Sequence, residues 1–138
     1  MYLIDTNVVS EIRKQHNANP GVIAFFQDVI DRDEEVFVSV ITIGELRRGV
    51  DKVRHRGDSD QADRLEHWLN EILGRYSEQI LDFSVNEAQI WGRLRVPHPE
   101  NALDKQIAAT ALAYDLILVT RNIDDFAGCS VRLMNPFS

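Results

Sequence analysis

Short apolar segments alternate with helical patterns along the chain, and this alternation constrains the fold more than any other feature. Apolar, strand-like runs cover residues 2–5, 35–40, 79–83, 116–120 and 130–134. Apolar residues at helical spacing lie between them, over residues 21–30, 41–53, 62–76, 84–95 and 103–115. Strands that are separated by helices form βαβ units with parallel neighbours. We therefore predict an α/β fold, with a mainly parallel sheet covered by helices on both faces.

Length and composition predict one domain over residues 1–138. The chain is 44% hydrophobic and 27% charged, which is ordinary for a globular protein with a single core. Its apolar stretches are much shorter than the ~20 residues of a membrane span, and its N-terminus has the pattern of a strand rather than of a signal peptide. The single cysteine, Cys129, cannot form an internal disulfide. We expect a cytoplasmic protein that makes no contact with a membrane.

The net charge of −7 argues against general nucleic-acid binding, which usually needs a basic surface. The charge is unevenly distributed, however. Residues 47–57 contain five Arg or Lys residues and one His, but only one acidic residue, Asp51. An acidic protein with such a local basic stripe can still bind a polyanion.

Polar side chains lie at and beyond the ends of two of the strand-like runs. They are Asp5, Thr6 and Asn7 at the end of the first run, and Thr120, Asn122, Asp124 and Asp125 at the end of the fourth. Because parallel strands end at the same edge of a sheet, we expect these side chains to lie together. Their oxygen atoms favour a hard cation such as Mg²⁺ or Mn²⁺ over Zn²⁺. The alternative is purely local, since Asp and Asn are common in turns and at helix N-termini.

Asp104 lies on the apolar side of the last long helix. A projection at ~100° per residue places Lys105 and Gln106 on the solvent-exposed side of this helix. The residues around Asp104 are instead apolar: Leu103, Ile107, Ala108, Ala111 and Leu112. An unpaired carboxylate in such a place is destabilising, and a bound cation would neutralise it. The alternatives are that Asp104 caps the helix or pairs with an arginine.

Glu45 has two interpretations. Thr42 and Glu45 are spaced as a capping box, in which the Glu only accepts a backbone hydrogen bond. Alternatively, Glu45 heads a basic row on its helix that could follow a phosphodiester backbone. The row consists of Arg48, Lys52 and Arg56, and the opposite, apolar side consists of Ile43, Leu46, Val50 and Val53.

Several common catalytic motifs are absent. The sequence has no GxxxxGK[ST] phosphate loop, no GxGxxG dinucleotide loop and no GxSxG nucleophile elbow. Its four histidines are scattered, without the spacing of zinc ligands. The candidate chemistry therefore depends on the carboxylates.

With these residues assembled, the chain resembles the PIN-domain ribonucleases, and in particular the VapC-type toxins of bacterial toxin–antitoxin pairs. The similar segments are LIDTNVVSE, SVITIGELRRGV, DKQIAATALAYDLILVTRNIDDF and the closing NPF. Together they cover nearly the full length. The resemblance implies a parallel sheet of about five strands between helices, with the acids of the family meeting at its carboxyl edge.

The resemblance also implies roles for individual residues. Asp5, Glu45 and Asp104 match three of the catalytic acids of the family, and Asp125 is expected to be the fourth because Asn122 stands where relatives carry Asp. Asp5 and Asp104 are expected to hold Mg²⁺, with Mn²⁺ as a substitute, while Glu45 and Asp125 ligate a second ion or orient water. The residues expected to support these acids through hydrogen bonds are Thr6, Asn7, Thr120 and Asn122.

The implied activity is Mg²⁺-dependent hydrolysis of RNA by the toxin of a toxin–antitoxin pair. Arg48, Lys52 and Arg56 would bind the RNA backbone, and the implied partners are a second copy of the chain and an inhibitory antitoxin that binds DNA. Two alternatives remain open. The first is a phosphoryl-accepting receiver domain, although residues 116–138 lack the late lysine that such domains use. The second is a PIN-fold interaction protein whose main role is to pair with a DNA-binding antitoxin and repress its operon.

Overall fold

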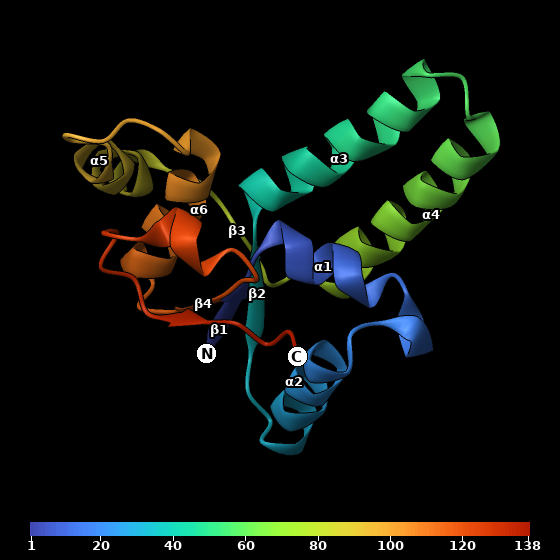
Figure 1. Cartoon of the computed structure of the whole chain (residues 1–138), viewed down its shortest axis with the longest axis horizontal. Helices are drawn as coiled ribbons and strands as arrows, with labels where there is room; N and C mark the ends of the chain where they lie inside the picture. The colour runs from blue at the N-terminus through green and yellow to red at the C-terminus, as the bar shows by residue number, and fades with distance from the viewer.

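A five-stranded, wholly parallel sheet forms the centre of the molecule (Figure 1). The computed structural model describes all residues from Met1 to Ser138. The strands are β1 (Tyr2–Ile4), β2 (Val36–Ser39), β3 (Ile80–Leu81), β4 (Ile117–Val119) and β5 (Leu133–Met134), in the order β3-β2-β1-β4-β5. The predicted α/β class and parallel sheet are confirmed.

Six α-helices and two 3₁₀ turns connect the strands. The helices are α1 (Thr6–Ile12), α2 (Pro20–Asp31), α3 (Val40–His55), α4 (Ser59–Arg75), α5 (Val85–Leu94) and α6 (Ala102–Ala113), and the turns are η1 (Gln15–Asn17) and η2 (Ile123–Phe126). The five helices predicted from apolar spacing are confirmed, and they differ from the predicted bounds by only a few residues. No helix is both long and apolar enough to cross a membrane.

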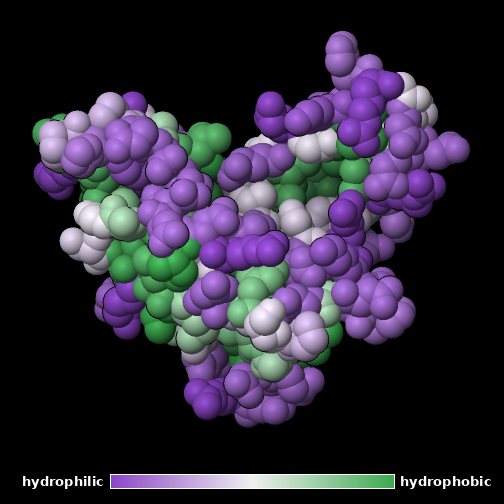
Figure 2. All heavy atoms as spheres, in the orientation of Figure 1, coloured by the Kyte–Doolittle hydropathy of each residue, from purple (hydrophilic) through white to green (hydrophobic).

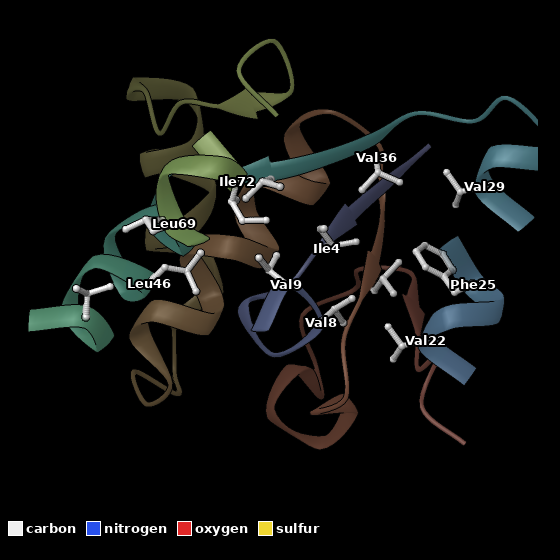
Figure 3. Close-up of a cluster of buried hydrophobic side chains, with 13 residues drawn as sticks. Ile4, Val8, Val9, Val22, Phe25, Val29, Val36, Leu46, Leu69 and Ile72 are labelled. Atoms are coloured by element: carbon white, nitrogen blue, oxygen red, sulfur yellow. The ribbon is translucent and has the colours of Figure 1, made fainter. Parts of the chain in front are cut away.

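Each face of the sheet packs against its own hydrophobic cluster. Successive side chains of a strand point to opposite faces, so Ile4 and Leu3 belong to different clusters. The Ile4 cluster includes Val8 and Val9 of α1, with further residues from α2, α3 and α4 (Figure 3). The Leu3 cluster is formed mainly by α6, β4 and η2. The prediction of helices on both faces is therefore confirmed.

The three central strands end at the same level. Ile4 is paired with Val38 of β2 on one side and with Val119 of β4 on the other. The backbone N–H of Asp5 donates to the Val119 carbonyl at 2.9 Å, which extends this register by one residue. The side chains that follow β1, β2 and β4 are thereby brought to one edge of the sheet.

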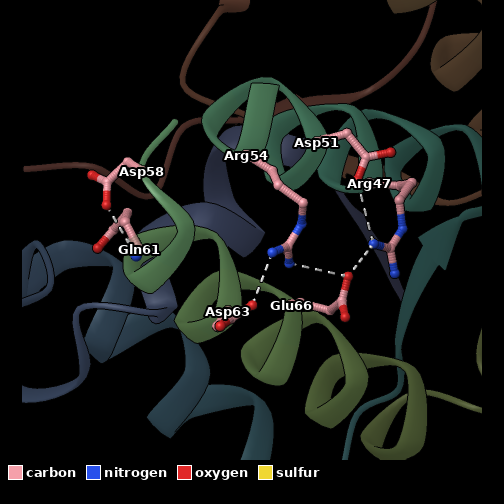
Figure 4. Close-up of polar contacts among 7 residues, drawn as sticks. All are labelled: Arg47, Asp51, Arg54, Asp58, Gln61, Asp63 and Glu66. Atoms are coloured by element: carbon pink, nitrogen blue, oxygen red, sulfur yellow. Dashed lines mark hydrogen bonds and ion pairs between the residues drawn. The ribbon is translucent and has the colours of Figure 1, made fainter. Parts of the chain in front are cut away.

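Helices α3 and α4 run side by side and extend away from the sheet (Figure 1). Ion pairs connect them along this length: Arg47 is 2.8 Å from Glu66, and Arg54 is 2.9 Å from Asp63 (Figure 4). These pairs are partly exposed, so each stabilises the hairpin only weakly. They also mean that two of the five basic residues in 47–57, Arg47 and Arg54, are already paired with carboxylates.

The predicted solvent-exposed side of α6 is wrong for Lys105. Lys105 is only 5% exposed, and its ammonium group donates to the carbonyl of His98, whereas Leu103 is 52% exposed. Helix α6 contacts α5, α3, β4 and η2, so it is covered on most sides. A projection that assumes one apolar stripe predicts exposure incorrectly for a helix that is covered on most sides. Lys105 can be buried there because its long stem packs among other residues while its ammonium group reaches a backbone carbonyl.

Candidate active site

Acidic side chains from four segments meet at the carboxyl edge of the sheet. Asp5 directly follows β1, Glu45 lies in the second turn of α3, Asp104 lies in the first turn of α6, and Asp125 belongs to η2 after β4. Figure 1 shows α1, α3 and α6 beginning around this edge. The negative charges of Asp5, Glu45 and Asp125 all raise the pKa of Asp104, which shows that these groups are within electrostatic reach of it.

Asp5 is the most buried of these acids, at 3% exposure. Its Oδ1 accepts from the backbone N–H of Thr6 at 2.7 Å, so it caps α1. Its Oδ2 accepts from Thr120 Oγ1 at 2.8 Å and from Asn7 Nδ2 at 3.2 Å. Burial raises the pKa of Asp5, and these three hydrogen bonds oppose that rise. The local capping interpretation is confirmed for Asp5, and it leaves lone pairs on both oxygens for a further ligand.

Asn7 and Thr120 join the ends of β1 and β4. Asn7 Nδ2 also donates to Thr120 Oγ1 at 3.3 Å, and Asn7 Oδ1 accepts from the backbone N–H of Arg121 at 3.0 Å. Thr120 Oγ1 accepts from the backbone N–H of Asn122 at 3.0 Å. Asn122 thus contacts the network through its backbone, and its side chain makes no hydrogen bond to any of the acids.

Glu45 is held by Thr6 rather than by a capping box. Thr6 Oγ1 donates to Glu45 Oε1 at 2.8 Å. The N-cap of α3 is Ser39, whose Oγ accepts from the backbone N–H of Ile41 at 3.0 Å. The capping-box alternative is therefore wrong, because α3 begins before Thr42 and Glu45 is already in its second turn. Burial raises the pKa of Glu45, and the Asp5 charge adds to this, while the Thr6 hydrogen bond and Arg48 oppose it.

Asp104 has neither of the partners that the structural alternatives require. It makes no ion pair and accepts no hydrogen bond, and the N-cap of α6 is Asn101. Burial, followed by the charges of Asp5, Asp125 and Glu45, raises the pKa of Asp104 to about 6. No positive group is among these causes. Both alternatives for Asp104, an arginine partner and a helix cap, are wrong.

The donor set fits a hard divalent cation. It consists of carboxylate oxygens supported by hydroxyl and amide groups. No three His, Cys, Asp or Glu side chains are arranged to ligate one ion directly. Mg²⁺ usually keeps several waters and needs only one or two protein carboxylates. An ion of this kind would also relieve the repulsion among the acids.

Thr42 belongs to this site, although the sequence did not predict it. Its side chain is fully buried, and its Oγ1 lies 3.1 Å from Thr6 Oγ1. The Thr6 hydroxyl has one hydrogen, so when it donates to Glu45 it accepts from Thr42. A hydroxyl in the first turn of α3 was visible in the sequence, but it was interpreted as half of the capping box.

The basic row is exposed and unpaired. Arg48, Lys52 and Arg56 make no ion pair, whereas Arg47 and Arg54 are paired with acids of α4 (Figure 4). The three cations of the row are therefore available to an external anion, and Arg48 is near enough to Glu45 to lower its pKa.

The chain is similar to known proteins over nearly its whole length. The family model described as PIN domain matches residues 2–128. Toxin FitB of Neisseria gonorrhoeae is 35% identical over 144 residues, which cover 99% of each chain. The VapC ribonuclease Y4jK of Sinorhizobium fredii is 27% identical over 143 residues, which cover 99% of this chain and 98% of that protein.

Solved structures show the same similarity. The crystal structure of FitAcB from Neisseria gonorrhoeae has a TM-score of 0.82 and 32% identity, over 99% of this chain and 98% of the other. VapBC2 from Rickettsia felis, bound to a DNA fragment from its promoter, has a TM-score of 0.76 and 25% identity, over 97% of each chain. Because the sequence match and the structural match both extend over nearly the whole chain, the chain belongs to the PIN-domain family.

Proposed function

We propose that the chain, acting as one nuclease domain over residues 1–138, is a metal-dependent endoribonuclease and the toxin of a toxin–antitoxin pair. The observation that carries this proposal is the meeting of four acids at one sheet edge where Asp104 has no positive partner. Relatives named as a toxin and as a VapC ribonuclease support the same function. The proposed reaction is hydrolysis of a phosphodiester bond in RNA.

Asp5 and Asp104 hold Mg²⁺ or Mn²⁺ in this proposal, and Glu45 and Asp125 ligate a second ion or orient the attacking water. A bound divalent ion supplies charge stabilisation at the phosphoryl oxygens and lowers the pKa of the water. The water oxygen forms the new bond to phosphorus, the bond to the leaving oxygen breaks, and that oxygen gains a proton. No serine, cysteine or histidine nucleophile is required.

The neighbouring polar residues have positioning roles. Thr6 orients Glu45, and Thr120 and Asn7 orient Asp5, through the hydrogen bonds of the structure. Asn122 contributes its backbone N–H to Thr120. Arg48, Lys52 and Arg56 bind backbone phosphates of the RNA, because they are the cations of residues 47–57 that have no carboxylate partner.

The test is cleavage of RNA by the purified protein. Wild type should cleave with Mg²⁺ and not with EDTA, and Asp5→Asn and Asp104→Asn should each lower the rate by more than 100-fold, since even outer-shell substitutions typically lower activity by ~10–100-fold. Asp124→Asn is the matched control, because Asp124 is exposed and is not a cause of the raised pKa of Asp104. Cleavage that continues in EDTA would contradict the proposal.

A second role, pairing with a DNA-binding antitoxin, is favoured by one observation. The solved VapBC2 relative is bound to DNA from its own promoter. In this role the chain forms a homodimer, and the antitoxin inhibits it and connects it to the operator. The Asp104→Asn protein separates the two roles, because it should still join an antitoxin–promoter complex in a gel-shift assay after it has lost cleavage.

A further inference from the structure

A cavity beside Glu45 has no role in the chemistry described above. It has a volume of about 180 Å³ and lies between α1, α3 and α4. Its lining residues are Thr6, Ser10, Arg13, Glu45, Leu46, Gly49, Val50, Leu65 and Trp68. Figure 2 shows apolar surface exposed between α3 and α4, with hydrophilic surface on both sides. The cavity thus combines an apolar wall with two residues of the acidic site, Thr6 and Glu45.

We propose that this cavity receives a nucleobase of the RNA, from a nucleotide next to the bond that is cleaved. This inference rests on the proposed function and names a subsite for its substrate. The cavity is smaller than the roughly 300–1,000 Å³ of pockets that enclose whole drug-sized ligands. It therefore has room for one planar ring system, while the sugar and phosphate stay outside.

An aromatic side chain and a cation without an ion-pair partner provide the chemistry for base binding. Trp68 is partly exposed and lines the cavity. The Arg13 guanidinium carbon lies 5.9 Å from the centre of the Trp68 ring and makes no ion pair. Arg13 can therefore turn from the indole to an incoming phosphate without breaking a salt bridge. Stacking on an aromatic ring accepts any base, because every base has a π-face.

The position of the cavity favours a nucleobase over a protein side chain. Gly49 is one helical turn beyond Glu45 on α3. Along the helix axis, this wall of the cavity is therefore about 6 Å from Glu45, a proposed catalytic acid. Arg48 and Lys52 of the same helix are exposed and unpaired, and they would hold the backbone on either side of the inserted base. A cavity with an acid and an aromatic side chain in its lining, and with unpaired cations on the same helix, matches a single-stranded nucleic acid.

Gly49 makes the cavity accessible. A Cβ built at Gly49 would meet no atom within 4 Å, and its φ is not in the left-handed region, so neither sterics nor backbone conformation requires glycine there. Glycine inside a helix is unfavourable relative to alanine. Gly44, Gly74 and Gly92 also have open space, but none of them lines this cavity. A side chain at position 49 would occupy the space that a base needs.

The test replaces Gly49 with Ala and Leu, and uses Gly92→Ala and Gly92→Leu as matched controls on α5. Both substitutions at position 49 should leave the thermal unfolding midpoint equal to or above that of wild type, because both raise helix propensity. Binding of a short fluorescent oligoribonucleotide is measured in EDTA, so that cleavage does not interfere. Gly49→Leu should weaken binding by on the order of tenfold, Gly49→Ala by less, and the controls not at all.

An abasic oligonucleotide gives the decisive comparison. Removing the base next to the cleaved bond should weaken binding to wild type by on the order of tenfold. The same removal should not weaken binding to Gly49→Leu further. In a Trp91→Phe protein, the remaining Trp68 fluorescence should be quenched by the intact oligonucleotide and not by the abasic one. Equal binding of intact RNA by wild type and Gly49→Leu would overturn the proposal.

Two further outcomes separate this proposal from others. If Gly49→Leu binds RNA normally but escapes an inhibitory protein partner, the cavity belongs to that partner and the nucleobase proposal is wrong. If wild type shows the abasic effect but no cleavage with Mg²⁺ or Mn²⁺, the base pocket is supported and the nuclease proposal fails.

Discussion

Thr6 Oγ1 donates a 2.8 Å hydrogen bond to Glu45 Oε1, and this contact joins the residue after Asp5 to the second turn of α3. One short side chain therefore sets the spacing between two acids that come from different elements. Because the Thr42 hydroxyl lies 3.1 Å from the same Thr6 oxygen, a buried hydroxyl also holds Thr6 in this orientation. The positions of Asp5 and Glu45 are coupled by this chain of contacts.

Thr6→Val should lower kcat of RNA cleavage by about 10–100-fold, in the range of lost supporting hydrogen bonds at metal sites. Valine keeps the shape and removes only the hydroxyl that orients Glu45. Thr6→Ser should restore most of the activity, because it restores the donor. A Thr6→Val protein with normal kcat and normal dependence on Mg²⁺ concentration would contradict a positioning role.

Asp104→Asn should stabilise the metal-free protein at neutral pH. The pKa of Asp104 is raised from its usual 3.8 to about 6, so the folded protein binds this proton more tightly than the unfolded chain. The contribution of protonated Asp104 to the free energy of unfolding is fully present below about pH 4 and is lost as the pH rises through about 6. Asparagine avoids that loss, so thermal melts in EDTA should show a midpoint a few degrees higher than wild type at pH 7 and little difference at pH 4. A lower midpoint at pH 7 would show that the carboxylate is structural.

Asp125→Asn should reduce cleavage strongly, and Asp124→Asn should not. The two residues are neighbours in η2, but only the Asp125 charge contributes to the raised pKa values of Asp5 and Asp104. Asn122→Asp also tests which residue after β4 supplies the fourth carboxylate, since it would place a carboxylate two residues after Thr120. If Asp125→Asn and Asp124→Asn lost activity equally, η2 would act through its fold rather than through one carboxylate.

Replacing Arg48, Lys52 and Arg56 together with Ala should weaken RNA binding and reduce its salt dependence. The slope of log affinity against log salt concentration should fall by about 2, at ~0.7 for each phosphate contact to a single strand. KM should rise while kcat changes little, because these contacts are present in both the ground state and the transition state. A triple variant of Arg32, Arg64 and Arg93 has the same loss of charge on other exposed surface, and it should keep the wild-type slope.

Gly21→Ala should destabilise the fold by roughly 1–3 kcal/mol, as overpacking typically does. A Cβ at Gly21 would lie 2.1 Å from the Pro136 carbonyl oxygen and 2.9 Å from the Ser138 nitrogen, so backbone would have to shift to admit it. Gly92→Ala, where the Cβ meets open space, should be neutral or stabilising. Urea unfolding of the two variants gives the comparison, and equal stabilities would contradict the close approach of the C-terminal segment to α2.

The sequence by itself determined the features that depend on neighbours in the chain. Strand and helix periodicities are local, and they predicted the parallel sheet and the helices from α2 to α6. The start of α2 depends on neighbouring residues as well, because Asn19 Oδ1 accepts from the backbone N–H of Gly21 at 2.9 Å and Pro20 is the first residue of the helix. The alternatives for Asp104 stayed open, because periodicity shows that a side chain is near apolar residues but not which charges approach it.

Only the tertiary structure decided the features that depend on segments far apart in the chain. From the sequence alone a capping box was the simpler interpretation of Glu45, and the structure overturns it because Thr6, 39 residues away, donates to Glu45. Lys105 was assigned to solvent because a projection considers one helix alone, whereas contacts from several elements bury it. The raised pKa of Asp104 has the same origin. Asp5 follows β1, Glu45 lies in α3 and Asp125 lies in η2, and only the register of the parallel strands brings their charges to one edge.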